Sequence, residues 1–297
     1  MIFIKKIINF FIFIFIKIKL FQLPKKSLRI LMFHNIDNFE KFYHQLLILK
    51  KEWNFINPND FYKIASGKKK IDKRYILLTF DDGFKSNLTV AEKYLKKFGT
   101  NAFFFIPLKF LLLKIDKEKK DFIKKNLELK KISPNMNNLN MVDIKKIINL
   151  NNIIGAHTYS HINLKKIKNK KKIHFEIIGS ANKLEKILKT KIFNFSFNFG
   201  RLKHISPIML RLSKKRFKYI FTGIRGDNIN SKKIFFRDNI SPEDNIFDIY
   251  SYLGGFFDFL YRKERVLIKN NFKKKLALDS YFKKPIKVWI NLISKHT

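Results

Sequence analysis

The chain contains no cysteine and few acidic residues. Its 297 residues include 63 Lys and Arg against 23 Asp and Glu, a formal net charge of +40. The lack of cysteine excludes disulfide bonds and any metal site with thiolate ligands. The shortage of acidic groups leaves a positive field that would attract a polyanion, whether nucleic acid, an anionic lipid surface or an acidic glycan.

Patterns that usually accompany specific nucleic-acid binding are also missing. The sequence shows no helix-turn-helix, no zinc finger and no interleaving of aromatic and basic residues. Lys is spread along the whole chain together with an excess of Ile, Asn and Phe, which indicates a compositional bias of exposed positions. We therefore expect no specific nucleic-acid partner. A solvated basic surface without a dedicated partner is the alternative explanation of the charge.

The amino terminus carries a short apolar run between lysines. Residues 7–16 are apolar except for Asn9, whereas a helix needs about 20 apolar residues to cross a bilayer. The run has the length of a signal-peptide core, but no small-x-small cleavage site follows it. We predict that residues 1–23 lie as an interfacial helix on an anionic inner-membrane surface, on a side that the sequence does not define. An uncleaved signal anchor or a secreted protein is the alternative.

Two adjacent carboxylates, Asp81 and Asp82, end an apolar run that we expect to be a strand over residues 75–80. Side chains on a strand alternate in direction, so one carboxylate can bind a cation while the other faces a substrate. An Asp-Asp-Gly sequence is also common in simple turns. Its position at the carboxyl end of a strand favours the functional interpretation, because α/β folds place their chemistry there.

Two histidines at four-residue spacing, His157 and His161, follow a second expected strand over residues 152–156. Neutral imidazole is a common ligand of first-row divalent metals. One carboxylate and two imidazoles supply three protein ligands, which leave a coordination position open for water. This inventory predicts a metal-dependent hydrolase. Zn²⁺ is the preferred ion, and Co²⁺, Fe²⁺ or Ni²⁺ would accept the same ligands.

The remaining sequence alternates expected strands and helices, which is typical of a mainly parallel sheet or barrel. We divide the chain into residues 1–23, one catalytic domain over residues 24–262, and a basic tail over residues 263–297. Residues 109–140 interrupt the alternation, and we interpret them as an insertion at the rim of the substrate groove. A helix is expected from Asn245 to about Tyr261. The sequence does not define an oligomeric state.

Three segments resemble the polysaccharide deacetylases, the family-four carbohydrate esterases, in order and composition: residues 78–84, 154–161 and 195–200. The likeness covers roughly residues 28–260. It implies a distorted (β/α) barrel and metal-dependent removal of acetyl groups from a cell-envelope or exopolysaccharide sugar. Acetylated glycans or lipid-linked sugars are the implied substrates, and N-acetyl groups are favoured over O-acetyl groups.

The resemblance also implies roles for individual residues. Asp81 is similar to the general base of the family, and the metal ligands would be Asp82, His157 and His161. Phe199 would supply a backbone N–H to the oxyanion. The strand over residues 28–34 resembles the opening strand of a permuted branch that includes exopolysaccharide deacetylases, in which a first-strand histidine acts as the acid, so His34 is the candidate here.

The chain departs from the family pattern at three points. Ser196 stands where many members have an Arg, and Asn198 stands where Pro is usual. Arg237 resembles a late arginine of one branch and could reach Asp81. No histidine lies between His204 and His296, so the usual late acid is absent. The alternatives are therefore a non-catalytic carbohydrate-binding member and a small-molecule amide or imide hydrolase on the same scaffold.

Overall fold

The structure is a computed structural model that describes residues 7–8, 10–11, 13–14, 22–129, 132–133 and 136–272. No helix within these ranges is both long and apolar enough to cross a membrane. Most of the expected interfacial segment and the chain after residue 272 lie outside the described residues, so the predictions for them stay predictions.

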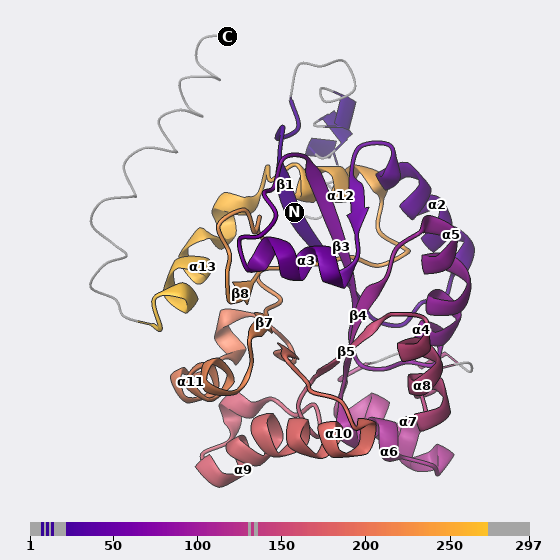
Figure 1. Ribbon diagram of the computed structural model, residues 1–297, viewed down its shortest axis with the longest axis vertical. Helices are drawn as coiled ribbons and strands as arrows, with labels where there is room; N and C mark the ends of the chain where they lie inside the picture. The colour runs from indigo at the N-terminus through magenta and orange to yellow at the C-terminus, as the bar shows by residue number, and fades with distance from the viewer. Residues whose placement is uncertain are drawn as a thin grey trace.

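A single parallel sheet forms the centre of the molecule (Figure 1). Its strands follow the order β8-β7-β6-β5-β4-β3-β1-β9, and β2 pairs with β3 beside this path. The strands are β1 (Ser27–Phe33), β2 (Asn54–Ile56), β3 (Arg74–Phe80), β4 (Ala102–Ile106), β5 (Ile153–Ala156), β6 (Asn194–Ser196), β7 (Tyr219–Phe221), β8 (Ile234–Phe235) and β9 (Asp238–Asn239).

The two ends of this sheet are consecutive in the chain. Only Phe236 and Arg237 separate β8 at one end from β9 at the other. Three residue steps span at most about 11 Å, so the sheet must curl until its two ends almost meet. This geometry confirms the predicted distorted barrel and places Arg237 at its seam. The short strand β9 was not predicted.

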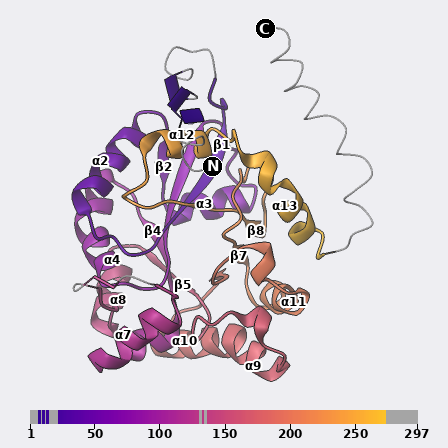
Figure 2. The same ribbon diagram turned by 180° about the vertical axis from the view of Figure 1, so that it is seen from behind.

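Helices surround the sheet, as Figure 1 and the reverse view in Figure 2 show. They are α2 (Phe39–Lys50), α3 (Pro58–Ala65), α4 (Ser86–Thr89), α5 (Lys96–Phe98), α6 (Leu108–Leu112), α7 (Asp116–Lys125), α8 (Met141–Asn149), α9 (Lys170–His174), α10 (Ser180–Leu188), α11 (Pro207–Arg216), α12 (Ile246–Leu253) and α13 (Arg262–Lys269). The π-helical turns η1 (Val90–Leu95) and η3 (Phe175–Gly179) join α4 to α5 and α9 to α10. Three 3₁₀ turns are η2 (Leu164–Lys166), η4 (Leu202–His204) and η5 (Asp258–Tyr261).

The helix expected from Asn245 to Tyr261 is shorter than predicted. It ends at Leu253, because Gly254 and Gly255 follow and Gly255 adopts a φ of 79°, a left-handed conformation that favours glycine. The chain beyond the expected boundary at residue 262 forms α13. Ile268 of this helix is fully buried in the main core, so the packed domain continues past that boundary.

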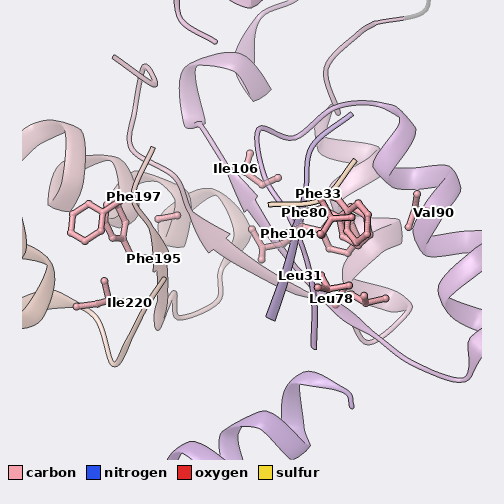
Figure 3. Close-up of a cluster of buried hydrophobic side chains, with 14 of the residues drawn as sticks. Leu31, Phe33, Leu78, Phe80, Val90, Phe104, Ile106, Phe195, Phe197 and Ile220 are labelled. Atoms are coloured by element: carbon pink, nitrogen blue, oxygen red, sulfur yellow. The ribbon is translucent and has the colours of Figure 1, made fainter. Parts of the chain in front are cut away.

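Aromatic side chains fill both sides of the sheet. On the outer side, Phe33, Phe80 and Phe104 stack beneath the helices, with centroids 5.5 Å and 5.1 Å apart (Figure 3). A second cluster holds the alternate strand residues, among them Leu28, Ile30 and Leu77, together with Phe61 of α3. Because strand side chains alternate between faces, this second cluster fills the barrel interior. Asp81 lies four residues after Leu77 and therefore points to the same face of the sheet. The candidate site thus borders the barrel interior.

Candidate metal centre

Asp82 follows the end of β3 in an unusual backbone conformation. Its φ is 72°, and Gly83 has a φ of 70°. His161 and Phe199 also adopt positive φ values, of 55° and 57°. Left-handed backbone is uncommon for residues other than glycine and tends to occur at functional sites, where surrounding structure holds it in place. Three of the residues singled out from the sequence thus lie in strained turns at the carboxyl ends of strands.

The structure brings Asp82, His157 and His161 together. Asp82 Oδ1 lies 3.4 Å from His157 Nε2 and 3.2 Å from His161 Nε2, and one potential ligand atom from each residue lies within 4.8 Å of the others. Ligand atoms bound tetrahedrally at about 2.0–2.1 Å from a zinc ion would be about 3.3 Å apart. All three side chains are buried. The spacing therefore fits a small divalent ion.

The other ring nitrogen of each histidine is already occupied. His157 Nδ1 lies 2.9 Å from the carbonyl oxygen of Ser196, and His161 Nδ1 lies 2.9 Å from that of Asn126. A carbonyl only accepts, so each Nδ1 must carry the proton and each Nε2 is left as a lone-pair donor. Asp82 Oδ1, in turn, is buried without a hydrogen-bond partner in the described chain. These donors fit a metal ion.

Asn126 comes from the segment that the sequence marked only as an insertion. It follows α7, and its side chain also donates to the carbonyl of Ser160 at 2.7 Å. The insertion therefore orients a metal-site histidine as well as contributing Leu127, Leu129 and Met136 to the wall of the cavity. No sequence pattern indicated the role of Asn126.

Glu176 is a second residue that the sequence analysis missed. This buried carboxylate accepts the N–H groups of Tyr159 and Ser160 at 3.0 Å and 2.9 Å, and the hydroxyl of Ser160 at 2.5 Å. It thereby holds the turn that precedes His161. Glu176 belongs to the π-helical turn η3, and such turns occur frequently at functional sites. A π-helical turn cannot be recognised from sequence periodicity.

Asp81 is held by Arg237 in the barrel seam. The guanidinium donates to both carboxylate oxygens of Asp81 at 2.7 Å, and both side chains are buried. Ser196 accepts from Arg237 at 2.6 Å and donates to Asp81 at 3.2 Å. The predicted approach of Arg237 to Asp81 is therefore present. Ser196 occupies a position where many family members have Arg, and here it bridges this pair.

Electrostatic surroundings favour the ionised form of both carboxyls. Burial opposes ionisation of Asp81, but Arg237 outweighs it and lowers the pKa of this group. Burial is likewise overcome at Asp82, where His161 and the other histidines hold the pKa well below its usual range. Burial lowers and Asp82 raises the pKa of His161, with a net increase. The site is thus built to hold negative charge next to imidazole.

His34 and Phe199 lie on the wall of the same cavity, which has a volume of about 470 Å³. His34 follows β1 and is half-buried. The Phe199 ring lies 5.0 Å from that of His161. Gly200 follows it with a φ of 47°, and a side chain there would approach the backbone nitrogen of Gly223 to 2.2 Å. Only glycine allows this turn to pack so closely.

Asn198 links two of the turns around the site. Its side-chain amide donates to the carbonyl of Ile162, just after His161. This contact needs an N–H donor, which the Pro usual at this position could not supply. The departure from the family pattern therefore replaces a rigid turn residue with a hydrogen bond between the second and third segments.

The chain is similar to known proteins in sequence and in fold. Residues 68–214 match the family model described as polysaccharide deacetylase. A search of curated proteins found no match. Several solved structures share the fold, at sequence identities of 15–19%.

IcaB from Ammonifex degensii is 17% identical with a TM-score of 0.63, over 79% of this chain and 100% of that one. The Streptococcus pyogenes deacetylase PplD, solved in complex with acetate, is 19% identical with a TM-score of 0.59, over 77% and 99% of the two chains. The BpsB deacetylase domain from Bordetella bronchiseptica is 15% identical with a TM-score of 0.55, over 73% and 98%.

The shared fold, the matched family model and the three motif segments agree. Residues 68–214 of this chain, which contain all three segments, belong to the polysaccharide deacetylase family.

Proposed function

We propose that this protein is a metal-dependent deacetylase that removes N-acetyl groups from an acetylated cell-envelope or exopolysaccharide glycan. One observation carries the proposal: Asp82 Oδ1 is buried and unpartnered in the described chain, between two Nε2 lone pairs and beside an ionised Asp81. A divalent ion bound there, Zn²⁺ by preference, would polarise the acetyl carbonyl and acidify a bound water.

Asp81 is the proposed general base. Its Oδ2 atom lies 3.7 Å from Nε2 of His157, one of the proposed metal ligands. Arg237 fixes the plane of this carboxylate and keeps it ionised, so it can accept a proton from the attacking water. Because the Arg237 guanidinium already binds both oxygens of Asp81, this side chain loses little rotational freedom when the reaction begins.

The family resemblance suggests roles for two further residues, Phe199 and His34, which both line the cavity. The Phe199 N–H is proposed to donate to the oxyanion as charge develops on the former carbonyl oxygen. His34 is proposed to protonate the departing amine, since it lines the cavity on the side of β1. Both roles are carried over from the family resemblance, and the shared cavity supports them.

The test is acetate release from an N-acetylglucosamine oligomer by the metal-loaded protein. Asp81→Asn should retain the ion and lose turnover, because the amide cannot accept the proton although it is nearly isosteric. Acetylxylan and a small cyclic imide serve as competing substrates. Ring opening of the imide, without acetate release from either glycan, would favour the amide hydrolase alternative, and no turnover of any substrate would favour the non-catalytic one.

We further propose that residues 1–23 attach the domain to an anionic membrane surface. In the described part of this segment, Ile7, Ile8 and Phe11 are exposed. The rings of Phe10 and Phe13 instead pack 5.2 Å and 4.7 Å from that of Phe247 on α12. One set of apolar side chains thus faces the protein and another faces outward, which supports an interfacial position.

A further inference from the structure

A second cavity, of about 680 Å³, is lined by residues of α9 and α11, two helices that contact each other. Its floor is apolar and includes Ile167, Ile173 and Ile208. Its rim consists of five cationic side chains, Lys165, Lys168, Lys170, Arg211 and Lys214. Nothing in the proposed deacetylation uses these residues.

No acidic side chain of the described residues lines this cavity, and no described carboxylate forms an ion pair with any of the five cations. Other basic residues with nearby acids do form such pairs, as Arg216 does with Glu185 at 2.8 Å and Arg74 with Glu52 at 3.2 Å. Lys214 is half-buried and donates to the amide oxygen of Asn271 at 2.6 Å. Burial and Lys233 lower the pKa of Lys214. This arrangement concentrates unneutralised charge in a concave site.

Ser206 adds an unused polar group to the same cavity. It occupies the N-cap position of the ten-residue helix α11, yet its side chain caps no backbone N–H. Its hydroxyl is buried without a hydrogen-bond partner in the described chain. The hydroxyl, the positive end of the helix dipole and the surrounding cations are the groups that bind phosphate in proteins.

The second cavity lies close to the metal centre. Lys165 is four residues after His161, so their Cα atoms are at most about 14 Å apart. The His204 ring packs 5.4 Å from that of Phe199 on the wall of the first cavity, and Ser206 of the second cavity follows two residues later in the chain. His204 therefore connects the walls of the two cavities along the chain.

We propose that this second cavity binds a phosphate group carried by the same glycan whose acetyl group enters the metal centre. The identity of the substrate rests on the proposed function, whereas phosphate binding in the second cavity does not. The upper limit of about 14 Å between the Cα atoms of His161 and Lys165 allows one short oligosaccharide to reach both cavities.

The first experiment measures binding of inorganic pyrophosphate by calorimetry to the full chain. Lys168→Ala/Arg211→Ala should weaken binding at least tenfold, and Ser206→Ala should weaken it severalfold. Lys93→Ala/Lys96→Ala removes two exposed charges from another part of the surface and should change affinity less than twofold. Equal losses in the two double variants would overturn the proposal, because they would mean binding by the general positive field.

The second experiment compares two substrates. With an uncharged N-acetylglucosamine oligomer, Lys168→Ala/Arg211→Ala should leave kcat and KM unchanged, whereas KM for a phosphorylated oligomer should rise about tenfold. An unchanged KM for the phosphorylated oligomer would contradict the proposal. Loss of binding to phosphatidylglycerol vesicles with unchanged pyrophosphate affinity would also contradict it, because the site would then serve the membrane. If no acetate is released, the pyrophosphate measurement still decides the question.

Discussion

Replacing Glu176 should weaken metal binding although this residue contacts no ligand atom. In Glu176→Ala the N–H groups of Tyr159 and Ser160 lose their acceptor in a buried position. Each unsatisfied buried group costs about 1–3 kcal/mol, so the free energy of unfolding should fall by roughly 2–5 kcal/mol. The turn that carries His161 would also relax, and loss of such supporting contacts commonly reduces metal affinity about 10- to 100-fold.

Zn²⁺ affinity measured by competition with a chromophoric chelator tests this reasoning, with thermal unfolding as a second readout. Glu176→Gln is the milder variant, since both N–H groups donate to the same carboxylate oxygen and the amide oxygen of Gln can still accept them. Glu185→Gln is the matched control, because Glu185 also accepts a backbone N–H, from Ile192 at 2.8 Å, but lies away from the site. The control should lose stability with unchanged metal affinity. Normal metal affinity in a folded Glu176→Ala protein would refute the argument.

Three other predictions follow from the structure. Arg237→Met should reduce kcat at least 100-fold with the metal retained, because Asp81 loses both hydrogen bonds from the guanidinium. An unchanged kcat, measured by acetate release, would refute a role of Arg237 in holding Asp81. Deleting residues 1–23 should move the protein to the soluble fraction while metal binding persists, and continued sedimentation with membranes at high salt would count against an anchor. Burial opposes ionisation of Glu264, but Arg201 and a backbone N–H lower its pKa below the usual 4.5. Ionised Glu264 therefore stabilises the folded protein above pH 4.5, and this stabilisation should be lost as the pH falls through the lowered pKa. In Glu264→Gln the decline in melting temperature below about pH 5 should be shallower, and an identical pH profile would show that the contact contributes nothing.

The sequence predicted the parts of the fold that depend on local patterns. Apolar runs located the strands that end before Asp81 and before His157. The alternation of strands and helices predicted a mainly parallel sheet or barrel, and the family resemblance implied the distorted barrel. The break after Leu253 could have been anticipated from the two following glycines. Strand β9 could not, because a two-residue pairing leaves no periodicity to detect.

Only the residues that would contact the metal ion or the substrate were predictable from the sequence. Asp82, His157 and His161 stand at recognisable spacings, whereas Asn126 and Glu176 act through a backbone carbonyl and a buried carboxylate in segments without a motif. Such contacts depend on how remote turns meet in space. Ser196 was noticed as a departure from a pattern, but its bridge between Arg237 and Asp81 became visible only in the structure.

Metal content measured by elemental analysis after dialysis is the decisive test of the metal centre. We expect one divalent ion per chain in the parent protein and in Asp81→Asn. We expect loss of that ion together with acetate release in Asp82→Ala, His157→Ala and His161→Ala. Full metal occupancy in the last three variants would contradict the assignment of the metal centre.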